Sequence, residues 1–426
     1  MFRWILFVVI YIGLSIYVIQ AIKATVRQPW WSYLYIGVAL AVLINFIYQF
    51  TVGEEAGRVL SVPKSYAFGF LLTILTFKII TIFFLFSEDI FRLVTGLYEK
   101  VFGTSKQFSL PQRRRFLSLI ALGIASLPFG ALLYGMYRGK YNFKVLKYDL
   151  EFADLPDAFD GYRITQISDI HSGSFDNREM IEYGVNLINK QKSDTILFTG
   201  DMVNNKTEEM LPWADLFSSL EAKDGKFSVL GNHDYGDYIP WETEELKQQN
   251  LKDLKVLQKN MGFDLLLNEH RYLQKGTDKI ALIGVENWGK GGFKKAGDLK
   301  KASSRIGNDD FKILMSHDPS HWEEEVINDS KHYHLTLSGH THGMQFGIEI
   351  PGWIKWSPVK WRYRYWAGIY KEMGQFINVN RGFGFLGYPG RVGIWPEITV
   401  ITLKKEVVNM ILTWLGATKI TVSLLF

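Results

Sequence analysis

Long apolar stretches near the N-terminus constrain this chain more than any other feature of its sequence. Residues 4–22, 30–50 and 116–137 contain no charged side chain. Each run is long enough to cross the ~30 Å hydrocarbon core of a bilayer as a helix. Residues 67–86 form a fourth candidate, interrupted only by Lys78, which must face the other helices or reach the headgroups. The sequence therefore predicts a four-helix transmembrane region within residues 1–140.

The basic residues indicate both a partner and an orientation. Residues 1–140 carry 14 Lys or Arg against 5 Asp or Glu, whereas the rest carries 34 against 38. Positive charge that flanks apolar segments favours a lipid bilayer over nucleic acid as the partner. The loop 86–116 is the richest in basic residues and ends in Arg113, Arg114 and Arg115. We expect this loop in the cytoplasm and the C-terminal domain on the outer face of the membrane.

Residues 112–118 read Gln-Arg-Arg-Arg-Phe-Leu-Ser and precede an apolar segment that contains small residues. This stretch resembles a twin-arginine export signal, and the alternative is an ordinary positive-inside anchor. Both interpretations keep the arginines in the cytoplasm of a bacterial cell. The chain has no cysteine, which excludes disulfides and thiol chemistry but fits either compartment.

From residue 141 the composition changes to apolar strands that alternate with charged helical stretches, which is typical of a layered α/β domain. We predict one such domain over residues 141–405, followed by an apolar tail, 406–426, that lies at the membrane interface or packs as a helix. The expected strands are 162–167, 195–198, 227–230, 280–285, 312–315 and 334–337, and the expected helix is 178–189.

Most of these predicted strands end in a polar cluster that contains metal-ligand side chains. In chain order the clusters are Ser168-Asp169-Ile170-His171, Gly200-Asp201, Gly231-Asn232-His233-Asp234, Ser316-His317 and Gly339-His340-Thr341-His342. The carboxyl ends of strands are where layered α/β proteins build their sites. Together the clusters supply enough imidazole, carboxylate and amide-oxygen donors for two metal ions, more than a single zinc needs.

This ordered set resembles the calcineurin-like metallophosphoesterases over about residues 147–403. The resemblance implies a two-sheet βαββα sandwich with a binuclear metal centre at the strand ends. It assigns Asp169, His171, Asp201 and His342 to one cation and Asp201, Asn232, His317 and His340 to the other, so that Asp201 bridges. His and carboxylate donors fit Mn, Fe or Zn better than Mg or Ca.

The resemblance also implies a reaction. Two cations ~3.5–4 Å apart share a hydroxide, clamp phosphate oxygens and stabilise an in-line displacement. His233 matches the family histidine that protonates the leaving group, and Asp234 is a candidate for orienting that imidazole. The segment after Asp201, Met-Val-Asn-Asn, lacks the Asp-Arg-Gly of the protein phosphatases in this superfamily, which argues against a phosphoprotein substrate.

The closing segment, residues 380–397, looks like the bacterial membrane-associated branch, which includes exported phosphoesterases and enzymes that cut lipid-linked diphosphates. Arg381 and Arg391 are candidate substrate contacts, and the alternative is that they brace the final strands through salt bridges. Residues 353–366 contain four Trp, two Tyr and four Lys or Arg. We interpret this segment, with Trp356 and Trp361, as a lip for an amphiphilic or lipid-linked phosphoester, and the alternative is a flap packed on the domain.

Three classes of function compete. A membrane-anchored metallophosphoesterase requires the full ligand set and the acid His233, and the sequence contains all of them. A non-catalytic interaction module with the same fold is the alternative, because such modules can lose ligands. A transporter would need a second charge in the spans or a pair of broken helices, and the sequence offers neither.

Overall fold

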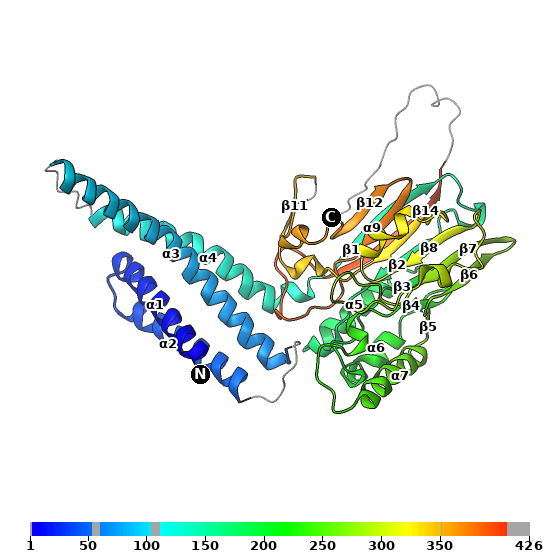
Figure 1. Cartoon of the computed structure of the whole chain (residues 1–426), viewed down its shortest axis with the longest axis horizontal. Coiled ribbons are helices and arrows are strands. Elements are labelled where there is room, and N and C mark those ends of the chain that lie inside the picture. The colour runs from blue at the N-terminus through cyan, green and yellow to red at the C-terminus, as the bar shows by residue number, and fades with distance from the viewer. Residues whose placement is uncertain (1, 53–59, 104–110, 351, 407–426) are drawn as a thin grey trace, which may run out of the picture. The chain divides into compact units, whose positions relative to one another are not determined.

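The computed structural model describes residues 2–52, 60–103, 111–350 and 352–406, and the chain divides into two compact units (Figure 1). One unit consists of residues 1–54 and 63–137, and the other of residues 55–62 and 138–426. Nearly all of the predicted apolar tail, 406–426, lies outside the described residues.

The first unit is built from four helices. They are α1 (Phe2–Thr25), α2 (Trp30–Thr51), α3 (Val62–Phe102) and α4 (Pro111–Tyr137). Each is long and apolar enough to cross a membrane, which confirms the predicted four spans. A helix pairs every backbone N–H and C=O within itself, and this is why an apolar run in lipid folds in this way.

The prediction of a loop over residues 86–116 is wrong for most of this range, because α3 and α4 extend into it from both sides. Helix α3 continues to Phe102, and its 41 residues correspond to about 60 Å of helix. The apolar pattern stops near residue 86, but no proline follows before Gly103, and Gly96 alone does not end the helix. Glu88 forms ion pairs with Arg113 and Arg114, and the Arg114 guanidinium lies 2.6 Å from the Asp89 carboxylate. Part of the basic charge used to predict the orientation is therefore neutralised by neighbouring acids.

Lys78 faces the inside of the helical unit. Its ammonium group donates a hydrogen bond of 2.8 Å to the Ser15 hydroxyl and lies 3.0 Å from the centre of the Tyr11 ring. The side chain is completely buried. A cation over an aromatic face with a hydroxyl acceptor has the contacts that a buried lysine requires, so these contacts fit a structural role.

The second unit contains two six-stranded sheets and a small hairpin. The first sheet has the order β1 (Lys144–Phe152), β14 (Glu397–Lys405), β2 (Arg163–Ile167), β3 (Thr195–Phe198), β4 (Lys226–Ser228) and β5 (Phe263–Leu265). The second has the order β12 (Gly368–Glu372), β13 (Gln375–Val379), β9 (Leu335–Ser338), β8 (Phe311–Met315), β7 (Asp278–Gly284) and β6 (Glu269–Lys275). The hairpin pairs β10 (Ile348–Ile350) with β11 (Ile354–Trp356).

The sheets pack face to face between two layers of helices, as predicted for a two-sheet sandwich. Helices α5 (Arg178–Asn189), α6 (Ala214–Ser218) and α7 (Glu244–Asn260) cover the first sheet, and α8 (Leu299–Ala302) and α9 (Ser320–Glu324) cover the second. The core between the sheets pairs residues such as Ile164 and Leu197 of the first with Leu282 and Ile313 of the second. Both sheets are therefore covered on both faces, which explains their nearly continuous apolar strands.

The strands that matter for the site are parallel neighbours. β2, β3 and β4 are adjacent and parallel in the first sheet, and β8 and β9 are adjacent and parallel in the second. Parallel neighbours end at the same edge of a sheet, so the loops that follow them converge. Gln166 of β2 donates a hydrogen bond of 2.8 Å to the carbonyl of Ser338 in β9, which joins the two sheets at this edge.

Candidate metal centre

The structure brings together all seven predicted ligands at the ends of these five strands. Asp169 and His171 follow β2, Asp201 follows β3, Asn232 follows β4, His317 follows β8, and His340 and His342 follow β9. Six of the seven are buried and His340 is half-buried. Burying several carboxylates and imidazoles together costs free energy unless their charges and lone pairs find partners. A bound cation would supply such a partner.

The Asp201 carboxylate stands in the middle of the group. Its Oδ2 lies 3.6 Å from His171 Nε2 and 3.1 Å from His317 Nε2. Its Oδ1 accepts a hydrogen bond of 2.8 Å from the backbone N–H of His233. One oxygen thus faces histidines on both sides, as a carboxylate shared by two cations must do.

Two sets of donor atoms flank this carboxylate. On one side His342 Nε2 lies 3.0 Å from His171 Nε2 and 3.2 Å from Asp169 Oδ1. On the other side Asp201, His317 and His340 place one donor atom each within 4.8 Å of one another. His340 Nδ1 lies 2.8 Å from Asn232 Oδ1, and the Asn232 amide group donates to the Tyr238 hydroxyl at 2.7 Å. The amide oxygen, which is the ligating atom, therefore faces the centre.

Hydrogen bonds at the far side of each ring fix which nitrogen can ligate. The Nδ1 atoms of His171, His233 and His317 face oxygens that only accept, at 3.1, 2.8 and 2.7 Å. These acceptors are the Asn204 side-chain oxygen, the Asn204 carbonyl and the Thr199 carbonyl. The proton of each neutral ring must then sit on Nδ1, so each Nε2 presents a lone pair. Such outer contacts orient metal-binding histidines in general.

The charges at the centre favour a cation. Burial lowers the pKa of His171 and of His340, which keeps both rings in the neutral, ligating form. Burial alone would raise the pKa of Asp201. The positive charge of His317 has the larger effect and holds the pKa of Asp201 well below its ordinary value. Burial lowers the pKa of His317, whereas attraction to Asp201 dominates and raises it to about 10. The negative charge that attracts a proton to His317 also attracts a metal ion.

The backbone at the ligands adopts an unusual conformation. Asp169, His171, Asp201, His340 and His342 all have φ between 48° and 69°, the left-handed region that residues with a Cβ rarely occupy. Such conformations cost about 1–3 kcal/mol each and persist only where the surroundings enforce them. Five of them in one cluster indicate that the loops are shaped to aim side chains.

Glycines beside the ligands allow the loops to approach closely. A Cβ on Gly339 would overlap the side chains of Ser168 and Asp169, and one on Gly231 would overlap Asp201. The glycine in the Gly-Asp, Gly-Asn-His-Asp and Gly-His-Thr-His clusters is thus needed for contact between loops from different strands.

His233 and Asp234 have different surroundings. His233 is half-buried, and its ring lies 4.8 Å from the His171 ring and 4.3 Å from the Tyr238 ring. Asp234 is buried and accepts hydrogen bonds from the backbone N–H groups of Gly231, Asp201 and Met202 at 2.8–3.0 Å. Burial and the charge of Asp201 raise its pKa to about 7. The structure does not support the predicted role of Asp234 in orienting His233, because Asp234 instead joins the loops of β3 and β4.

The predicted substrate residues fall into two groups. Arg381 forms ion pairs with Glu349 and Glu397, and Arg391 donates to the carbonyls of Arg381 and Gly384. Both arginines are buried, and their contacts fit the bracing alternative, through ion pairs for Arg381 and through backbone carbonyls for Arg391. Trp361 is 75% exposed, whereas Trp356 is half-buried and contacts it edge to face at 6.0 Å.

Sequence reasoning missed the residues that support the ligands. Asn204 contacts His171 through its side chain and His233 through its carbonyl. Tyr363 lies 2.8 Å from His340 Nε2 through its hydroxyl. The sequence signal for Asn204 is the stretch Met-Val-Asn-Asn after Asp201, because it places an amide side chain three residues beyond a ligand. Tyr363 had no local signal, because 22 residues separate it from His340.

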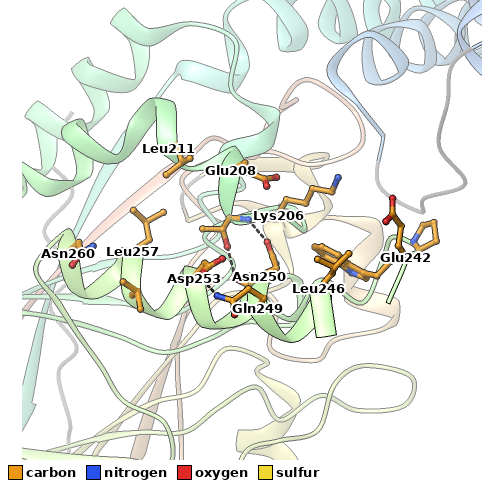
Figure 2. A pocket seen from close by; sticks show the side chains of 14 residues that line it. Lys206, Glu208, Leu211, Glu242, Leu246, Gln249, Asn250, Asp253, Leu257 and Asn260 are labelled. Carbon is orange, nitrogen blue, oxygen red and sulfur yellow. Dashed lines mark hydrogen bonds between the residues drawn. The ribbon is translucent and has the colours of Figure 1, made fainter. Parts of the chain in front are cut away.

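A separate surface hollow of about 630 Å³ lies beside α7 (Figure 2). Lys206, Thr207, Trp241, Leu246 and Asn250 are among its lining residues, and no predicted site residue is. Thr207 donates from its backbone to the Asn250 side chain at 2.8 Å, and Asn250 donates to the Asn205 carbonyl at 3.0 Å. We interpret these two hydrogen bonds as the contacts that hold the loop after Asp201 against α7.

Comparison with known families agrees with this geometry. Residues 2–140 match the family described as "Probable Calcineurin-like phosphoesterase, transmembrane domain", and residues 162–344 match "Calcineurin-like phosphoesterase". The fold, the strand-end donors and these matches define a metallophosphoesterase domain joined to a transmembrane region.

Similar proteins extend the comparison. An uncharacterized metallophosphoesterase of Bacillus subtilis, YkuE, is 30% identical over 68% of this chain and 97% of its own length. A transmembrane protein with a metallophosphoesterase domain from Danio rerio is 25% identical over 69% of this chain and 63% of its own. An uncharacterized metallophosphoesterase of Aquifex aeolicus is 28% identical over 65% of this chain and 98% of its own length. The chain belongs to the calcineurin-like metallophosphoesterases, a family that binds divalent metals, and it is a membrane protein.

We predict that Asp201→Asn lowers metal affinity by more than about 100-fold, because the shared carboxylate compensates charge on both sides of the centre. Metal bound per purified chain after dialysis, measured by mass spectrometry, checks this. His233→Ala is the matched control and should keep its metal. Depletion in His233→Ala with full retention in Asp201→Asn would reverse the assigned roles.

Gly339→Ala should weaken metal binding about 10–100-fold although it changes no ligand, because its Cβ must displace Asp169. Gly292→Ala is the control, since a Cβ there meets nothing within 4 Å. The measurement is competition with a metal indicator of known affinity. Equal affinity in the two variants would show that the close approach at Gly339 does not position the centre.

Proposed function

We propose that this protein is a membrane-anchored hydrolase that cleaves a phosphate ester or diphosphate at two divalent cations. The observation that carries the proposal is the Asp201 oxygen placed between His171 and His317, with Asp169, Asn232, His340 and His342 around it. This donor set fits Mn, Fe or Zn. When bound, such ions activate water and neutralise the negative charge on phosphate oxygens.

His233 would act as the general acid. It is half-buried beside the buried donors, its Nδ1 proton is held by the Asn204 carbonyl, and Nε2 is left to carry the proton for the leaving oxygen. Its ring packs on Tyr238, which limits its rotation. Proton delivery matters most when the leaving alkoxide is strongly basic.

An amphiphilic or lipid-linked phosphoester is the proposed substrate class. Four membrane spans hold the protein at a bilayer, and the exposed Trp361 lies in the segment that follows the ligands His340 and His342. Tryptophan and basic side chains prefer the headgroup region, where the phosphate of such a substrate lies. We further propose the bacterial cell membrane as the location and its outer face as the side that carries the catalytic domain.

The reaction is tested with the full chain purified in detergent and loaded with Mn²⁺. We expect hydrolysis of a soluble chromogenic phosphodiester that EDTA abolishes. His233→Ala should lower kcat by about 10²–10⁴-fold with poor leaving groups and much less with good ones. A metal-loaded protein that hydrolyses neither soluble esters nor lipid phosphates would favour the non-catalytic alternative.

The substrate class is tested by Trp361→Ala. It should lower turnover of a lipid phosphate in mixed micelles by about tenfold, which corresponds to the loss of one interfacial aromatic contact, and leave the soluble diester unchanged. Met373→Ala, at an exposed apolar position in the turn between β12 and β13, is the control. Equal loss on both substrates, or no loss on either, would contradict a lipid substrate.

The proposed orientation can be tested in intact cells, because the chain has no cysteine of its own. A cysteine at the exposed Lys252 should react with a membrane-impermeant maleimide before lysis. A cysteine at Lys100, near the end of α3, should react only after lysis. The opposite pattern would place the catalytic domain in the cytoplasm.

A further inference from the structure

The hairpin of β10 and β11 begins six residues after His342 and has two unlike faces. Its register pairs Ile348 with Trp356 and Ile350 with Ile354, while Glu349 pairs with Lys355. Residues directly opposite each other in a hairpin point to the same side. One face is therefore entirely apolar and the other is charged.

The charged groups of the other face contact the domain, although the Lys355 side chain is exposed. The Glu349 carboxylate lies 2.6 Å from the guanidinium of Arg381, which is itself buried, and the Lys355 ammonium donates to the carbonyl of Ala367. On the apolar face Ile348 is 52% and Ile350 is 43% exposed, while Ile354 and Trp356 are half-buried. A sheet with one face in water normally shows the reverse arrangement, with apolar residues inside.

More apolar side chains extend this outward face. Met344, Phe346, Trp353 and Trp361 are all exposed, and Trp361 touches Trp356. Single exposed apolar residues are ordinary, but several from one short segment indicate a contact surface. We call the group Met344, Phe346, Ile348, Ile350, Trp353 and Trp361 the hairpin surface.

The charge around the hairpin surface identifies its partner. Residues 344–366 contain four Lys or Arg and one acid, Glu349, which is paired with Arg381. Arg364 is in turn paired with Glu372, and Lys355 donates to the Ala367 carbonyl. Lys360 and Arg362 are exposed beside Trp361. Tryptophan together with basic residues and aliphatic side chains fits an anionic headgroup region with hydrocarbon beneath it. The chain already resides in a membrane through its four spans.

We propose that the hairpin surface inserts into the bilayer at the level of the headgroups. Both ends of the segment connect to the candidate metal centre, since Met344 follows His342 by two residues and Tyr363 contacts His340. Insertion would therefore bring the centre to the lipid surface. The inference deepens the proposed function by naming the route from bilayer to metals, but its test requires no turnover.

The test uses the full chain in nanodiscs that contain anionic phospholipid. Single cysteines replace Ile350 or Trp353 and carry an environment-sensitive fluorophore. Met373→Cys, in the turn between β12 and β13, and Tyr183→Cys, on α5, are the controls, because both positions carry an exposed side chain outside the hollow beside α7. Each label is quenched first by spin-labelled lipid and then by aqueous iodide.

We expect lipid-borne quenching at Ile350→Cys and Trp353→Cys to exceed that at the controls by about threefold or more, with protection from iodide. Labels as accessible to iodide as the controls would overturn the proposal. Protection from both quenchers would also overturn it, because a protein segment such as residues 407–426 or a second copy would then cover the surface. Neither result depends on phosphoesterase activity. Failure of the insertion proposal can therefore be told apart from failure of the proposed function.

Discussion

The arrangement of the catalytic unit depends on the single carboxylate of Asp201. Its Oδ2 faces His171 of one donor set and His317 of the other, and its Oδ1 holds the backbone of His233. Around it the loops must approach so closely that Gly231 and Gly339 cannot carry a Cβ without displacing a ligand. The strand order supplies this proximity, because β3 is the central of three parallel neighbours whose carboxyl ends meet the ends of β8 and β9.

The fold was largely predictable because its signals are local. Apolar runs gave the four spans, and short apolar strands followed by polar clusters gave β2, β3, β8 and β9 close to their observed bounds. Apolar content does not reveal the extension of α3 to Phe102, because the residues after 86 include charged side chains and are supported by the ion pair of Asp89 with Arg114.

The candidate site was predictable in its ligands and less so in their surroundings. Asp169, His171, Asp201 and the others carry their chemistry in their own identity and in their position after strands. The functions of Asn204, Asp234 and Tyr363 depend on contacts between distant loops, such as that between Tyr363 and His340, which no local pattern encodes. Arg381 and Arg391 show the same limit: an arginine near a site in sequence does not reveal whether it faces a substrate or a carbonyl.

Each of the two donor sets draws on both sheets, since His342 comes from the second sheet while its companions Asp169 and His171 come from the first, and Asn232 from the first joins His317 and His340 from the second. Cations held there would cross-link the two halves of the sandwich. Thermodynamic linkage then requires that anything that loosens the packing between the sheets also weakens metal affinity, and that metal loading tightens the packing in return. A substitution in the core between the sheets, for example at Leu197 or Leu335, would therefore weaken metal affinity although neither residue is a ligand. Metal supply in the surroundings would in turn set the rigidity of the whole domain.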